Sequence, residues 1–174
     1  MKTDLRQAQW DKWRGQRLRP GATDEDDALL DHDGEQDGWG TVGAVALDRD
    51  GVLAAATSTG GMTGKPVGRV GDTPLIGAGT WADADVAVSC TGVGEAFIRT
   101  VAAHSVAVNH RSMPLEEAAQ RVLDEVQPLG GRGGLIAVSR DGDVVLPFQT
   151  MLMYRGLYHE DGGVSVGIGP DMTA

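Results

Sequence analysis

The sequence has 174 residues, which allows one domain of ordinary size, and 41% of them are hydrophobic, enough for a core. Its net charge of −10 argues against nucleic acid or an anionic membrane as a partner, because both repel an acidic protein. A single cysteine, Cys90, excludes an internal disulfide and fits a reducing compartment, and no run reaches the roughly 20 apolar residues of a membrane span. We therefore expect a cytoplasmic protein with no membrane segment.

The first forty residues differ in composition from the rest. Residues 4–19 are predicted to form a short helix that ends near Arg19-Pro20-Gly21. Residues 24–37 carry many Asp and Glu side chains and neither Lys nor Arg, so this run repels itself and buries little. It is interpreted as a solvated, mobile linker, and the simpler alternative is an ordinary acidic tail.

From residue 41 the pattern becomes that of β-structure. Residues 41–48 and 52–58 are rich in small and β-branched residues and are joined by Asp48-Arg49-Asp50-Gly51, which favours a hairpin. Residues 60–73 contain several glycines and a proline and are predicted to form a loop. Two further strands are expected over residues 75–81 and 86–90.

The second half begins with two predicted helices. Residues 94–109 place apolar side chains at helical spacing, and Pro114 is expected at the first position of a second helix with acidic residues in its first turn. After a glycine-rich loop at 130–134, residues 135–138 and 144–148 form a last predicted hairpin around Asp141-Gly142. Strands, two helices and strands together predict an α+β fold.

Small hydroxyl residues, one arginine and one aspartate recur along this glycine-rich chain. Each has an ordinary interpretation by itself: a Gly-Thr strand start, a threonine near a turn, a salt bridge within a loop, and a threonine N-cap. The four histidines are scattered without metal-ligand spacing, so we expect no metal site and no cofactor. The residues concerned are Gly40 with Thr41, Thr59, Arg69 with Asp72, and Thr91 with Gly92.

Taken together, the runs at 41–48, 57–62, 68–72, 89–92 and 130–137 resemble the β-subunit of plant-type L-asparaginase/isoaspartyl peptidase, an N-terminal-nucleophile (Ntn) hydrolase family. The resemblance implies an αββα sandwich of which this chain supplies about half. Residues 41–174 would be the catalytic β-subunit, and residues 1–40 the tail of the α-part followed by the linker. It also implies a missing α-part or second chain and an (αβ)2-type oligomer.

The resemblance implies roles for the residues singled out above. Cleavage between Gly40 and Thr41 would make Thr41 both nucleophile and N-terminus, and its α-amino group, with an ordinary pKa of about 8, would act as the base. Thr59 would hydrogen-bond to the nucleophile. Arg69 would bind the α-carboxylate of the substrate and Asp72 its α-ammonium. Thr91 and Gly92 would contact the substrate and form the oxyanion hole.

The implied reaction is hydrolysis of the side-chain amide of L-asparagine and of β-aspartyl dipeptides. Three alternatives remain open from the sequence: a glycosylasparaginase-like amidase, a non-catalytic truncated homologue that acts as a binding or scaffold subunit, and a generic β-rich binding module. Met151 and Leu152 are bulky where the family has a small residue, which affects the far wall of the pocket, and no chemistry is assigned to the tail from Tyr158.

Overall fold

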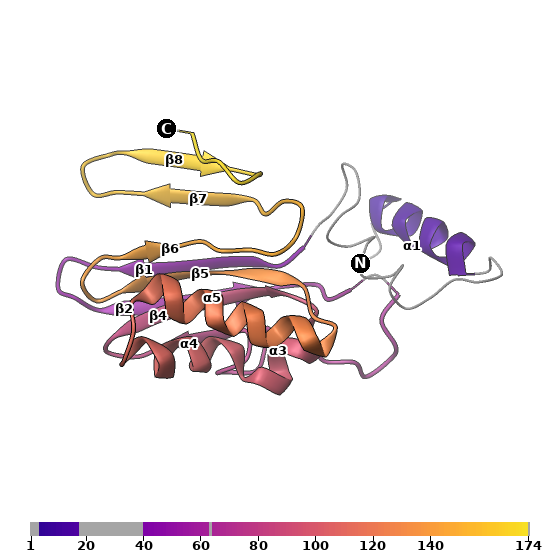
Figure 1. Ribbon diagram of the computed structural model, residues 1–174. Helices are drawn as coiled ribbons and strands as arrows, with labels where there is room; N and C mark the ends of the chain where they lie inside the picture. Colours follow the sequence, from indigo (N-terminus) through magenta and orange to yellow (C-terminus); the bar gives the residue numbers. More distant parts are fainter. Residues whose placement is uncertain (1–3, 18–39, 63, 174) are drawn as a thin grey trace.

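The computed structural model describes residues 4–17, 40–62 and 64–173, and it shows a mixed α and β protein (Figure 1). The predicted acidic linker at 24–37 lies outside the described residues. Helix α1 covers Asp4–Arg17, as expected. The remaining elements, in chain order, are β1 (Val42–Leu47), β2 (Leu53–Ser58), β3 (Thr80–Ala82), β4 (Val86–Gly92), α3 (Gly94–Thr100), α4 (Ala102–His110), α5 (Leu115–Val126), the 3-10 turn η1 (Gln127–Leu129), β5 (Gly133–Ser139), β6 (Val144–Val145), β7 (Arg155–Tyr158) and β8 (Val164–Gly167).

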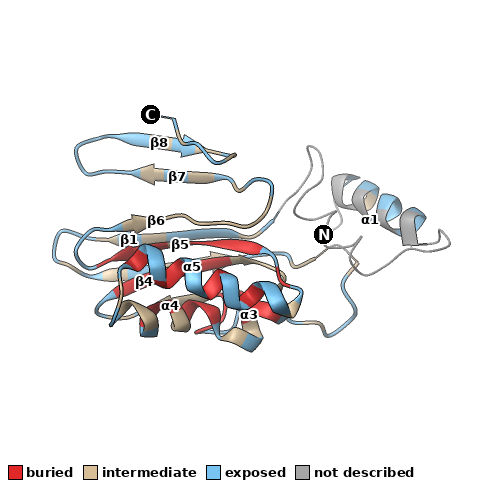
Figure 2. Cartoon of the chain, in the orientation of Figure 1, coloured by how far each residue is buried: buried red, intermediate tan, exposed pale blue. Residues whose placement is uncertain are grey.

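The centre of the fold is an antiparallel sheet in the order β3-β4-β5-β6. Strands β4 and β5 pair at seven positions, from Val86 opposite Ser139 to Gly92 opposite Gly133. Both strands are buried along most of their length, because other elements cover both faces of the sheet (Figure 2). Burial on both faces explains why their sequences are nearly continuous apolar runs and do not alternate with polar residues.

Helices α3, α4 and α5 cover one face of this sheet (Figure 1). The apolar side of α5 is fully buried, and it packs with the inward residues of α3, α4, β4 and β5 into a single core. Phe97, Leu123 and Leu135 are the largest fully buried side chains, and Cys90 is buried with them, as predicted. Burying such a side chain contributes about 1.5–3 kcal/mol.

The β1–β2 hairpin lies across the other face of the sheet. Its strands pair in register from Val42 opposite Ser58 to Leu47 opposite Leu53, and the turn between them is closed by the Asp48 carboxylate, which accepts hydrogen bonds from two backbone N–H groups. This confirms the predicted hairpin. Helices, central sheet and hairpin therefore form three layers.

Three local predictions were wrong. Residues 75–79 form turns and only Thr80–Ala82 is a strand, because the backbone bonds within residues 72–80 and Gly77, at φ +94°, fold this segment back on itself. The helix over 94–109 is broken at Val101, which has φ +49°. Pro114 is the residue that flanks α5 on its N-terminal side, in an extended conformation, and the helix begins at Leu115.

The C-terminal tail contains a hairpin that the sequence did not predict. Strands β7 and β8 pair from Arg155 opposite Gly167 to Tyr158 opposite Val164, and they form a small sheet of their own. Arg155 ties the hairpin to the rest of the fold, since its guanidinium lies over the Phe148 ring; the same group also donates to the Gly169 carbonyl at the end of the hairpin. Within the described part of the chain, the helices are too short or too polar to cross a membrane.

Candidate active site

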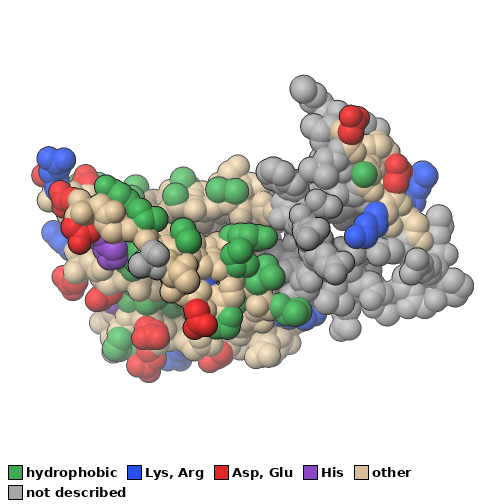
Figure 3. Space-filling view, turned by 90° about the horizontal axis from the view of Figure 1, so that it is seen from above, with side chains coloured by type: hydrophobic (Ala, Val, Ile, Leu, Met, Phe, Trp, Pro, Cys, Tyr) green, Lys and Arg blue, Asp and Glu red, His purple; other side chains and the backbone are tan. Residues whose placement is uncertain are grey.

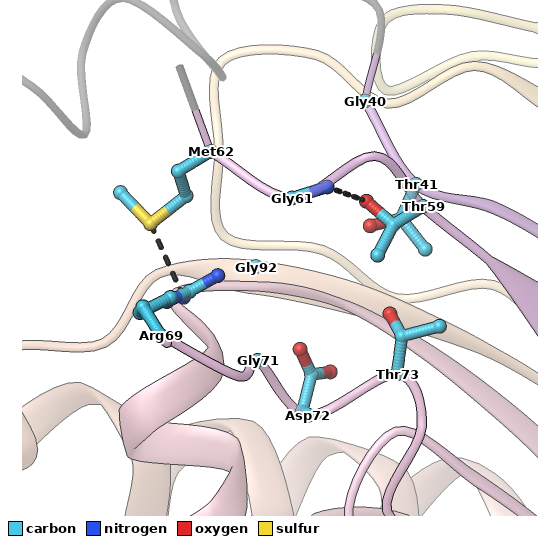
Figure 4. A pocket seen from close by; sticks show the side chains of 10 residues that line it. All are labelled: Gly40, Thr41, Thr59, Gly61, Met62, Arg69, Gly71, Asp72, Thr73 and Gly92. Atoms are coloured by element: carbon cyan, nitrogen blue, oxygen red, sulfur yellow. Dashed lines mark hydrogen bonds between the residues drawn. The ribbon is translucent and has the colours of Figure 1, made fainter. Parts of the chain in front are cut away.

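Two threonines meet at the open end of the β1–β2 hairpin. Thr41 directly precedes β1 and Thr59 directly follows β2, and the pairing of Val42 with Ser58 places the two threonines side by side. Figure 4 shows both side chains at the same point of the site. The Gly61 N–H donates to Thr59 Oγ1 at 3.0 Å, so the turn that leaves the hairpin holds the Thr59 hydroxyl in place.

The next part of the site is an arginine held by a glutamate. Arg69 donates from Nε to Glu95 Oε1 at 2.7 Å and from Nη2 to Glu95 Oε2 at 2.9 Å, and Nη2 also lies 3.3 Å from Met62 Sδ. The hydrogen bond from Arg69 holds the pKa of Glu95 below its usual value. Such a two-point pair fixes the plane of the guanidinium. Arg69 therefore forms an ion pair with Glu95, at the start of α3.

The acidic part of the site is a buried carboxylate. Asp72 is only 5% exposed, and among the described residues none donates a hydrogen bond to its Oδ2. Burial raises the pKa of Asp72, and its own backbone N–H, the Arg69 charge and the Thr73 N–H oppose this shift only in part. A buried carboxylate oxygen without a partner is costly, so it is suited to receive a cationic ligand.

Glycines allow these groups to come together. A Cβ on Gly94 would lie 2.9 Å from Asp72 Oδ1 and 3.1 Å from Arg69 Nη2, so both of these side chains converge on the start of α3. Gly92 has φ +151°, and a Cβ there would lie 2.4 Å from the Arg132 carbonyl oxygen. A side chain is therefore excluded at Gly92, so at this residue β4 presents only backbone atoms to the site.

All the predicted site residues except Thr91 line one hollow, which has a volume of about 380 Å³ including its open mouth. The Thr41 and Thr59 hydroxyls lie on one side of it, and Arg69, the Asp72 carboxylate and the Thr73 hydroxyl lie on the other, as Figure 4 shows. Such a set can bind a zwitterion and present a hydroxyl to it. Thr91 precedes Gly92 in β4 and is not among the lining residues. The lining residues are Gly40, Thr41, Thr59, Gly61, Met62, Arg69, Gly71, Asp72, Thr73 and Gly92.

Three residues of this region had no role predicted from the sequence: Thr73 and Met62, which line the hollow, and Glu95, which pairs with Arg69. Glu95 follows Gly94 and would ordinarily be interpreted as an acidic residue in the first turn of a helix. Thr73 follows Asp72 directly, and Met62 ends the run 57–62 that resembles the family; these positions are the only signals for the two residues. Gly40 has a φ outside the left-handed region, and a Cβ there would meet no atom of the described residues within 4 Å. Among the described residues, no group of His, Cys, Asp or Glu could hold a metal ion.

The chain matches the family described as asparaginase over residues 1–168, and it belongs to that family. It is 53% identical over 160 residues to an isoaspartyl peptidase of Escherichia coli (strain K12), which covers 81% of this chain and 50% of the relative. It is 54% identical over 147 residues to an isoaspartyl peptidase of Salmonella typhimurium, covering 80% and 47%. An isoaspartyl peptidase/L-asparaginase of Macaca fascicularis is 46% identical over 138 residues, covering 78% and 44%. The chain spans about half the length of the curated relatives it matches.

Proposed function

We propose that this chain supplies the nucleophile and the substrate clamp of an isoaspartyl peptidase/L-asparaginase. The observation that carries the proposal is the convergence of Thr41, Thr59, Arg69, Asp72 and Gly92, from four separate segments, on one hollow. The clamp has opposite charges in one small space, which matches the α-carboxylate and α-ammonium of an amino acid. The relatives named above favour this substrate class over a glycosylated asparagine.

The first step is cleavage of the chain before Thr41. The Thr41 hydroxyl attacks the Gly40 carbonyl, and the N→O acyl shift breaks the peptide bond, frees the Thr41 α-amino group and leaves an ester. Water then hydrolyses this ester and releases the Gly40 carboxylate and the Thr41 hydroxyl. Gly40 and Thr41 both line the hollow, so the bond to be cut faces the same space as the later substrate. The free amine, with an ordinary pKa of about 8, then takes the proton of Thr41 Oγ1.

Amide hydrolysis follows by the same hydroxyl. Thr41 Oγ1 attacks the side-chain carbonyl of the substrate, its proton passes through the amine to the leaving ammonia or amino acid, and a β-aspartyl ester remains. Water hydrolyses this ester and restores the hydroxyl. Thr59 hydrogen-bonds to the nucleophile. Gly92, which lines the hollow, donates to the developing oxyanion together with Thr91, which precedes it in β4 and does not line the hollow before substrate binds. Loss of one such donor typically costs about 10²–10³ in kcat.

The rest of the αββα sandwich comes from a second chain or from an α-part, and residues 41–174 act as its β-subunit half, with residues 1–40 as the tail of the α-part and the linker. The outward side of the β1–β2 hairpin carries alternate small apolar residues, Val42, Ala44, Ala46, Ala54 and Ala56, in exposed positions. An open apolar sheet face of this kind requires a covering layer. We assign that layer to the missing part, in an (αβ)2-type oligomer.

A second apolar face on β7–β8 supports the same assignment. Seen from above, over β8, apolar side chains gather on the surface of the molecule (Figure 3). The residues include Tyr154, Tyr158, Val164, Val166 and Ile168, all exposed.

The test is an intact mass of the purified chain after incubation, alone and co-expressed with the preceding half of a relative. A split between Gly40 and Thr41 is expected in the wild type and in Thr41→Ser, and not in Thr41→Ala. Release of ammonia from L-asparagine and of amino acids from β-aspartyl dipeptides is then measured on the cut protein. A chain that stays near 18.2 kDa in both preparations refutes the hydrolase and leaves the non-catalytic scaffold subunit.

A further inference from the structure

Thr73 presents a buried hydroxyl to the hollow that the roles above leave unused. The residue is 8% exposed and lines the hollow, and within the described part of the chain its Oγ1 has no hydrogen-bond partner. In Figure 4 its hydroxyl points up into the space below Thr41 and Thr59, beside the Asp72 carboxylate. A buried hydroxyl without a partner costs free energy, so a threonine at this position needs a reason.

Thr73 and Asp72 form a pair of unpartnered acceptors on one wall. Asp72 Oδ2 and Thr73 Oγ1 belong to consecutive residues, and both are buried and unpaired with any described residue. A carboxylate only accepts hydrogen bonds, and a hydroxyl has two acceptor lone pairs as well as one donor. A primary ammonium group carries three N–H donors and one positive charge, so it is the ligand that satisfies both atoms together.

The segment that carries the pair is rigid. The Leu75 N–H donates to the Asp72 carbonyl at 2.9 Å, and the N–H groups of Ala103 and His104 at the start of α4 donate to the carbonyls of Ala78 and Gly77. Gly79 packs so closely behind the pair that a Cβ on it would lie 2.7 Å from both the Asp72 carbonyl and Thr73 Cα. The two acceptors are thus held in position before any ligand binds.

We propose that Thr73 is a further substrate-binding residue: its Oγ1 accepts a hydrogen bond from the α-ammonium group of the amino-acid substrate, next to the one accepted by Asp72. The inference rests on the proposed function, in which Asp72 receives that ammonium group. Asp72 and Thr73 would then recognise the amine together, and Thr73 would help the site to bind amino acids more tightly than dicarboxylates that lack the amine.

The experiment compares L-aspartate with succinate, which has both carboxylates and lacks the amine. Calorimetric binding is measured for the wild type, Thr73→Val, Thr73→Ser and Asp72→Asn, in the form that the intact-mass experiment yields. Valine has the shape of threonine without the hydroxyl, and serine keeps the hydroxyl. Because a hydrogen bond to a charged group is removed, Thr73→Val is expected to weaken L-aspartate binding by about tenfold or more. Succinate binding should change by less than about twofold, and Thr73→Ser should bind L-aspartate nearly as the wild type does.

The outcomes separate this inference from the proposed function. If Thr73→Val binds L-aspartate like the wild type, or loses both ligands in equal proportion, while Asp72→Asn loses L-aspartate, the role of Thr73 is refuted and the clamp stands. If the wild type itself does not bind L-aspartate, the proposed function of the hollow fails, and the role of Thr73 fails with it. A thermal melt of Thr73→Val controls for folding and is expected at or above the wild-type midpoint.

Discussion

Replacing Gly43 by alanine tests how closely the two β-layers approach. Gly43 of β1 lies against Ser89 of β4: a Cβ on Gly43 would be 2.1 Å from Ser89 Oγ and 3.0 Å from Ser89 Cβ. Ser89 is not free to turn away, because its Oγ shares a 2.7 Å hydrogen bond with Thr57 Oγ1. Alanine must therefore either separate the layers or rotate Ser89 and break this bond.

The cost follows from these contacts. Forcing an extra methyl group into a close-packed layer typically costs about 1–3 kcal/mol, and the lost hydrogen bond about 1 kcal/mol. Alanine recovers about 0.5–1 kcal/mol because it loses less backbone entropy than glycine in a strand. We expect Gly43→Ala to lower the free energy of unfolding by about 2 kcal/mol, which is a large share of the stability of an ordinary domain.

The assay is urea unfolding followed by circular dichroism, for the wild type, Gly43→Ala, Ser89→Gly and the double variant. With glycine at residue 89, the nearest remaining atom to the new methyl group is the Ala56 carbonyl oxygen, at an ordinary 3.7 Å. Gly43→Ala should then cost nothing, so the coupling free energy between the two sites is about 2 kcal/mol. An equal cost of Gly43→Ala in both backgrounds, or no cost in the wild type, refutes this account of the contact.

Three further substitutions test the clamp and the helix break. Glu95→Gln should weaken succinate binding several-fold by calorimetry, because Arg69 loses the charge that orients it. Since the pKa of Glu95 is lowered, its ion pair stabilises the folded protein above about pH 4.5, and this stabilisation is lost as pH falls through the lowered pKa. Unfolding curves of Glu95→Gln should not show this loss. Asp72→Asn should abolish L-aspartate binding yet raise the free energy of unfolding at pH 7 by about 1 kcal/mol. Because the pKa of Asp72 is raised, the wild type gains stability as pH falls through that pKa, and the difference between the two proteins should shrink there. Val101→Gly should raise the thermal midpoint by a few degrees, since a β-branched residue at φ +49° is strained and glycine is not; an unchanged or lower midpoint would mean that the half-exposed valine side chain contributes more than the strain.

The sequence was most informative where local chemistry decides the structure. The turn residues Asp48 to Gly51 predicted the hairpin, and the hairpin register alone brings Thr41 beside Thr59. The apolar spacing of α5 predicted its buried face. In each case neighbours in the chain supply the determining contacts.

Prediction failed where distant contacts decide. The sequence has no glycine or proline at Val101 that would predict the helix break there. The break allows the N–H groups of Ala103 and His104 to reach the carbonyls of residues 78 and 77, more than twenty residues away in the chain. The same contacts hold residues 75–79 in turns, against their strand-like composition. Glu95 is an ordinary first-turn acid until the fold brings Arg69 to it, and only the structure shows that Thr73 is buried without a partner.

The hydrogen bonds from α4 to residues 77 and 78 decide whether the wall of the site becomes ordered during folding or only when a ligand binds. They join the wall that carries Asp72 to a helix of the hydrophobic core, so the wall and the core open together and not separately. In amide hydrogen exchange, Ala103 and His104 should accordingly exchange as slowly as the buried strands, with or without a ligand. The entropic cost of ordering this wall falls on the folding of the chain, so it does not reduce the free energy of ligand binding.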